Sequence, residues 1–161
     1  MASRDISKEE KLTRALRDAL RETFRMSFGI DIDPGQWAAK HFQKVSSQAV
    51  ACSVELRNNG NNEGAFVLVF HFDFVRELLK KLGAPVDDAL IKDTAEEIAN
   101  MVLGVMKTNL NAKGNRYQPV FPHAIKKDQP LSSFNFCEDC LCMPFYSGTY
   151  ENEALLSLVR M

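Results

Sequence analysis

The chain has 161 residues, of which 45% are hydrophobic and 25% are charged, values that suit one globular domain spanning residues 1–161. The formal net charge of −1 argues against nucleic acid as the main partner, because phosphate binding requires a basic surface. No apolar run reaches membrane-spanning length and the polar N-terminus has no signal-peptide core, so we expect a cytoplasmic protein without membrane insertion and with reduced cysteines.

The N-terminal segment has the pattern of a long amphipathic helix. Ser7 and Glu10 are spaced as a capping box, and leucines recur every four residues as far as Phe24. Gly29 is expected to end this helix. Four arginines share another side of it: Arg14, Arg17, Arg21 and Arg25. They form either a solvated face or a docking surface for an acidic partner.

The next part of the chain changes to extended patterns. Residues 30–47 contain a Pro-Gly turn and no clear period, which predicts a loop with a short strand. Residues 50–56 alternate with a period of two, as in a half-buried strand. The Asn- and Gly-rich segment 57–64 is expected to form a turn, after which residues 65–72 pair back as a hairpin.

Two further helices follow this hairpin. Asp73 is expected to cap a helix over residues 74–82 that stops at Gly83. Asp87 opens a longer helix, and Gly114 closes it. Both helices contain apolar residues at helical spacing, so each is expected to cover a sheet.

The remainder of the chain reads as strands. One strand is expected at about 117–124, and a longer pair is expected around the turn at Ser147 and Gly148. The order is therefore helix, hairpin, short helix, long helix and strands. This order predicts an α+β fold with a mostly antiparallel sheet and long helices packed on one face.

The long predicted helix carries a row of polar residues beside its apolar stripe. The row consists of Asp93, Glu97, Asn100 and Gly104, which share one narrow arc at about 100° per residue. The stripe consists of Ile98, Met101, Val102 and Val105, which share a neighbouring arc. The row either borders the buried face and contacts water, or it binds a partner.

The residue types of the row restrict its chemistry. An asparagine amide both donates and accepts hydrogen bonds, so Asn100 is able to hold and orient a water molecule. The carboxylate of Glu97 suits a lysine or arginine. The sequence shows no nucleophile–base pair, metal-ligand cluster or Gly-rich phosphate loop beside these residues. Any reaction here would take its charge stabilisation from the partner.

The motif around these residues resembles that of a known family. The segment EIANM (97–101), preceded by Asp93, is similar to the CheX members of the CheC/CheX/FliY family, which are phosphatases of the chemotaxis response regulator CheY. Glu97 and Asn100 match the family motif in identity and spacing, and Pro122 is the best match for its distant proline. The similarity extends more loosely from residue 16 to residue 125.

The resemblance implies a division of work at the site. Glu97 is expected to pair with the active-site lysine of the regulator, and Asn100 is expected to orient the water that attacks its aspartyl phosphate. Asp93, Gly104 and Pro122 are expected to contact the regulator. Gly104 would let the regulator backbone approach, or it would allow close packing between helix and sheet.

The resemblance also implies the composition of the assembly. No cofactor of its own is expected, since the Mg²⁺ would come with the phosphorylated regulator. The first helix offers only Glu22, with Arg25 where a second asparagine would stand, which leaves one site per chain. CheX relatives are dimers, so a homodimer is expected. The alternative is a non-catalytic regulator-binding or flagellar-switch-like module with the same fold.

The cysteines allow a different interpretation. Cys137, Cys140 and Cys142 lie close together, and Cys52 is a candidate fourth zinc ligand. A zinc ribbon normally has two CxxC pairs, however, and this chain has one. The cysteines are therefore expected to be small buried side chains rather than metal ligands.

Overall fold

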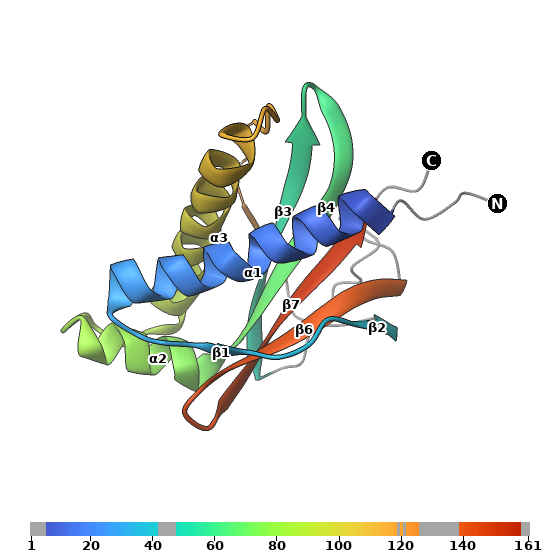
Figure 1. Cartoon of the computed structure of the whole chain (residues 1–161). Helices are drawn as coiled ribbons and strands as arrows, with labels where there is room; N and C mark the ends of the chain where they lie inside the picture. The colour runs from blue at the N-terminus through green and yellow to red at the C-terminus, as the bar shows by residue number, and fades with distance from the viewer. Residues whose placement is uncertain (1–5, 42–47, 119, 121, 126–138, 159–161) are drawn as a thin grey trace.

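The computed structural model describes residues 6–41, 48–118, 120, 122–125 and 139–158, which form helices and an antiparallel sheet (Figure 1). The helices are α1 (Ile6–Phe28), α2 (Phe72–Lys81) and α3 (Asp88–Asn111). The strands are β1 (Asp33–Pro34), β2 (Ala38–His41), β3 (Ala49–Asn58), β4 (Asn61–His71), β5 (His123–Ile125), β6 (Asp139–Ser147) and β7 (Tyr150–Leu158). None of these helices combines the length and the apolar character needed to cross a membrane.

The described strands form one antiparallel sheet in the order β1-β6-β7-β4-β3-β5, and β2 also pairs with β6. The β3–β4 hairpin and the β6–β7 hairpin meet where β4 pairs with β7. All three helices contribute to one hydrophobic core on the same face of the sheet. The predicted α+β class, with a mostly antiparallel sheet and helices on one face, is confirmed.

The first hairpin has a shorter turn than the sequence predicted. Strands β3 and β4 pair as far as Asn58 and Asn61, so residues 57–64 are mostly strand. Only Asn59 and Gly60 form the turn, with φ of 54° and 80°. A two-residue Asn-Gly turn with both residues at positive φ suffices to connect two strands. The longer turn predicted from the sequence was therefore wrong.

The predicted helix starts were right for α3 and wrong for the two others. Asp87 caps α3, and its Oδ1 accepts a hydrogen bond from the Leu90 N–H at 2.8 Å. The cap of α2 is His71, not Asp73, because β4 runs directly into the helix and the His71 Nδ1 accepts from the Asp73 N–H at 3.1 Å. Helix α1 already includes Ile6, so Ser7 lies within the helix and is not its cap.

The strands outside the hairpin were predicted unevenly. The described part of residues 30–47, which ends at residue 41, holds two short strands, β1 and β2, where one was expected. Of the strand predicted at about 117–124, the described residues show an isolated bridge from Tyr117 to Asn58 and the start of the short β5. The pair around Ser147 and Gly148 is confirmed as the β6–β7 hairpin.

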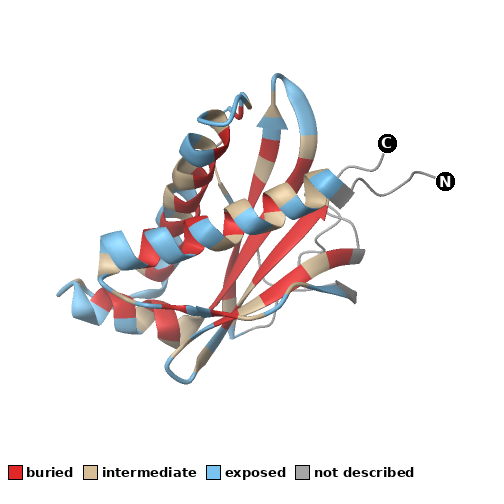
Figure 2. Ribbon diagram, viewed as in Figure 1, coloured by how far each residue is buried: buried red, intermediate tan, exposed pale blue. Residues whose placement is uncertain are grey.

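The core between helices and sheet centres on aromatic rings. Phe24 of α1 lies 5.6 Å from Phe74 of α2 and 6.2 Å from Phe145 of β6, measured between ring centroids. It also contacts Phe28 and Phe70. In Figure 2 the buried residues of α1 lie along the side that faces the sheet. These ring contacts join α1 to both hairpins.

The C-terminal end of α3 is fixed by side chains. Asn111 accepts a hydrogen bond from the Tyr117 N–H at 2.7 Å and donates one to the Tyr117 carbonyl at 3.1 Å. The Tyr117 hydroxyl donates to Glu63 of β4. Burial, together with this hydrogen bond, raises the pKa of Tyr117 well above its usual range, so the hydroxyl keeps its proton. Helix α3 is therefore held at both of its ends.

Candidate functional site

The predicted polar row lies on the side of α3 that faces away from the sheet. Asp93, Glu97 and Asn100 are exposed, and Gly104 is half-buried. The buried residues of α3 lie on the other side: Ile91, Ala95, Ile98, Ala99, Val102, Leu103, Met106 and Leu110. Figure 2 shows exposed and half-buried residues along the outer side of α3. The row is therefore a surface feature that a partner is able to reach.

The apolar stripe predicted beside the row is only partly buried. Ile98 and Val102 lie in the core, whereas Met101 and Val105 are half-buried. The latter two are on the flank of α3 next to α1, which packs across α3 (Figure 1). Because α1 covers this flank incompletely, two residues that the sequence placed in the core lie partly at the surface, next to the row.

The polar side chains of the row have no partners among the described residues. Across the part of the chain that the structure describes, Asp93, Glu97 and Asn100 form no side-chain hydrogen bond or ion pair. Their carboxylates and amide are exposed, so water or a partner is able to reach them. Binding a partner at this row would break no contact with the described residues.

Gly104 continues the row without a side chain. A Cβ added at this position would meet no heavy atom within 4 Å outside the neighbouring backbone of its own helix. Close packing between helix and sheet, one of the two explanations that the sequence allowed, is therefore wrong. Glycine in a helix interior destabilises by roughly 0.5–1 kcal/mol relative to alanine, and no internal contact in the described structure offsets this cost.

Pro122 lies apart from the helix in sequence but on a neighbouring element. It is half-buried and immediately precedes β5. Strand β5 pairs with β3 and contacts α3. The structure therefore places Pro122 at the edge of the sheet close to α3, while its role in binding stays a prediction.

The cysteines divide between the two faces of the sheet. Cys52 belongs to the main core under the helices, whereas Cys140 and Cys142 belong to a smaller cluster on the opposite face. Cys52 therefore cannot complete a metal site with the other two. Cys137 lies outside the described residues. Burial, with the nearby charge of Glu96 as a second cause, raises the pKa of the Cys52 thiol to about 12.

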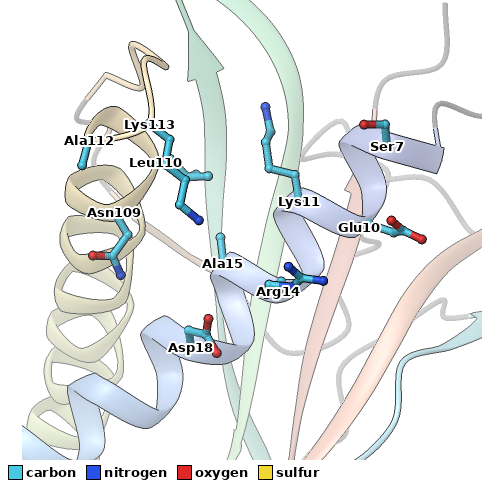
Figure 3. A pocket seen from close by; sticks show the side chains of 10 residues that line it. All are labelled: Ser7, Glu10, Lys11, Arg14, Ala15, Asp18, Asn109, Leu110, Ala112 and Lys113. Atoms are coloured by element: carbon cyan, nitrogen blue, oxygen red, sulfur yellow. The ribbon is translucent and has the colours of Figure 1, made fainter.

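No metal site is present in the described residues, where no group of three or more His, Cys, Asp or Glu side chains is arranged to hold an ion. A hollow of about 610 Å³ lies between the first half of α1 and the end of α3 (Figure 3). Its lining includes charges of both signs, such as Arg14 and Asp18, and no residue of the row. Lys11, in the same lining, donates to Asn115 at 3.1 Å. This hollow is thus separate from the row.

Solved structures define the class of protein to which this fold belongs. A CheC-like superfamily protein from Shewanella sp. PV-4 superposes with a TM-score of 0.75 at 19% identity, covering 92% of this chain and 97% of that one. A chemotaxis protein CheX from Desulfovibrio desulfuricans gives 0.72 at 21% identity, covering 91% and 97%. CheX from Borrelia burgdorferi, in a complex with CheY, BeF₃ and Mg²⁺, gives 0.67 at 21%, covering 91% and 96%. The fold is therefore CheC-like.

The sequence identifies the family within this class. The family model described as chemotaxis phosphatase CheX matches residues 50–145, and the chain belongs to this family. The matched region contains α3 with the whole polar row, and also Pro122. No curated protein matched the sequence.

The open space at Gly104 leads to a first prediction. Gly104→Ala should raise the free energy of unfolding by about 0.5–1 kcal/mol, because alanine restricts the unfolded chain and meets no obstacle in the folded one. Chemical denaturation followed by circular dichroism measures this change. The control is Gly29→Ala, because Gly29 also has open space but a φ of 64°, which makes alanine strained there. A loss of stability in Gly104→Ala would show that this glycine has a structural role.

Proposed function

We propose that this protein hydrolyses the aspartyl phosphate of a CheY-type response regulator. The observation that carries the proposal is the row of Asp93, Glu97 and Asn100, exposed on one helix and without partners among the described residues. Membership of the chemotaxis phosphatase family supports it. So does the similar CheX from Borrelia burgdorferi, which was crystallised with CheY, BeF₃, an analogue of a phosphoryl group, and Mg²⁺.

In this mechanism Asn100 provides the catalytic amide. Its side chain accepts a hydrogen bond from a water molecule and holds the oxygen in line with the bond between phosphorus and the aspartate oxygen. As the water oxygen bonds to phosphorus, the bond to aspartate breaks, giving inorganic phosphate and a free carboxylate. Positioning of this kind is a main source of rate acceleration in phosphoryl transfer.

Glu97 lies three residues before Asn100, nearly one helical turn away on the same exposed side. Its carboxylate is proposed to pair with a lysine of the regulator beside the phosphoryl group. This contact would orient the regulator on α3 and place the phosphoryl group against Asn100. Asp93 lies one turn before Glu97, nearer the start of α3, and extends the same acidic surface.

The division of work leads to a prediction on Asn100. Asn100→Ala should lower kcat for dephosphorylation by about 10²–10³-fold, as does the loss of one well-placed hydrogen-bonding group elsewhere. The affinity for the phosphorylated regulator should change little. Asn100→Asp should be at least as damaging, because it adds negative charge beside an anion. Loss of phosphate from candidate phosphorylated regulators, measured over time, gives both constants.

Glu97→Ala provides the comparison, because it should weaken binding as well as slow turnover, and raised salt should reproduce part of its effect. Both variants should fold normally, since both side chains are exposed. Near-normal dephosphorylation by Asn100→Ala would overturn the mechanism. Binding without any turnover by the wild-type protein would instead indicate a non-catalytic regulator-binding module.

The Mg²⁺ needed for this reaction is proposed to come from the regulator. The acids of α3 lie along one helix and do not converge from separate elements, as the ligands of a Mg²⁺ site must. Calorimetry should therefore detect no tight Mg²⁺ binding to the isolated protein, while chelation of Mg²⁺ should stop dephosphorylation. Tight binding to the isolated protein would contradict this proposal.

We also propose that the protein works as a homodimer, with one site on each chain. In the described residues the three-residue strand β5 ends the strand order, so its outer edge has no strand partner among them. An open strand edge favours association with another chain. Light scattering at micromolar concentration should give twice the mass of the chain, which is 18.2 kDa. A monomer mass would count against the proposal.

A further inference from the structure

A hollow of about 490 Å³ lies between α1 and α3 on the flank next to the polar row. We call it the α1–α3 groove and define it by Thr23 and Met26 of α1 and by Met101, Gly104 and Val105 of α3. Gly104 belongs both to this groove and to the row. Met101 follows Asn100 directly in the chain. Since one turn of helix rises about 5.4 Å, the groove begins within about one turn of Asn100.

The wall of the groove on α1 is an exposed methionine. Met26 is 76% exposed, more than any other large hydrophobic residue in the described part of the chain. An unbranched thioether adapts its shape to an incoming apolar group, which makes methionine common on binding surfaces. The facing Met101 is held in place, because Ser27 contacts its sulfur at 3.5 Å.

Thr23, which lines the groove, carries a polar group without a partner among the described residues. Thr23 is only 2% exposed, and its Oγ1 is buried. Within the described structure this oxygen has no hydrogen-bond partner. A buried hydroxyl without a partner costs about 1–3 kcal/mol. Gly104 of α3 also lines the groove and lowers the stability of its helix. No contact within the described structure offsets this cost. Two unfavourable features therefore meet in one hollow, and an added binding partner would offset both.

We propose that the α1–α3 groove receives an apolar side chain of the phosphorylated regulator, with an N–H beside it that donates to Thr23. This inference rests on the proposed function, since it assigns a second contact to the same partner. The groove adjoins Asn100, so the inserted side chain belongs to a segment of the regulator close to its phosphoryl group. Met26 would close over that side chain, and the missing Cβ at Gly104 would let its backbone approach α3.

The proposed docking contact should affect binding of the regulator but not the chemical step, so KM and kcat test it separately. Met26→Ala should raise KM for a phosphorylated regulator that the protein dephosphorylates by about 10-fold, as expected for truncation of an apolar anchor at an interface, and leave kcat within about twofold. Met26→Asp should raise KM further. The control is Tyr146→Ala, which removes an exposed aromatic side chain, hydrogen-bonded to Glu151, from the opposite face of the sheet and should leave both constants unchanged.

A second variant tests the buried hydroxyl. Thr23→Val keeps the shape of the side chain and removes the group without a partner, so the free protein should be as stable as the wild type or more stable. Its affinity for the regulator loaded with BeF₃ and Mg²⁺ should nevertheless fall several-fold. A purely structural role for Thr23 would lower stability and leave affinity unchanged.

The outcomes distinguish this inference from the proposed function. If the wild-type protein dephosphorylates the regulator and the Met26 variants keep its KM, the groove is not a docking site and the proposed function stands. If the wild-type protein neither binds nor dephosphorylates any phosphorylated regulator, the proposed function itself fails. If Met26→Asp instead converts a dimer to a monomer in light scattering, the groove binds a second copy of the chain, and the inference is wrong.

Discussion

The packing of α3 against both the sheet and α1 is the constraint on which the rest of the structure depends. Buried side chains on one side of α3, including Ala95 and Ala99, leave the other side open. Asp87 at its start and the Asn111–Tyr117 hydrogen bonds at its end restrain the helix. A helix held in this way presents its outer side chains in a fixed direction. Such preorganisation lets a small number of polar groups act on a bound partner without rearrangement.

The surface that results is simple in composition. It holds carboxylates and one amide, and the described residues around it include no metal cluster. In the proposed mechanism these groups stabilise charge only together with the cations of the regulator. The reacting centre would then be complete only in the complex, which would restrict hydrolysis to a correctly docked partner. The helix-destabilising Gly104 and a buried hydroxyl at Thr23 fit a surface adapted to that complex.

Periodicity predicted the helices and the two hairpins, because their apolar residues recur at spacings that only one kind of element satisfies. It failed where contacts distant in sequence decide the outcome. The cap at His71 depends on β4 running into α2, and the exposure of Met101 depends on where α1 crosses α3. The row itself was predictable, since helical geometry fixes which residues share a side. The groove was not, because Thr23 and Met101 are brought together only by the fold.

The strand order also determines how the chain can fold. Strand β7, the last of the described elements, lies in the middle of the sheet between β4 and β6. During synthesis, the β3–β4 hairpin and the helices therefore emerge before the strand that pairs with the edge of β4. That edge carries Val67 and Val69 and stays unpaired until β7 leaves the ribosome. Pairing over such a sequence distance is slow, and the exposed edge can bind other chains in the interval. The described sheet is thus complete only after β7 has been synthesised.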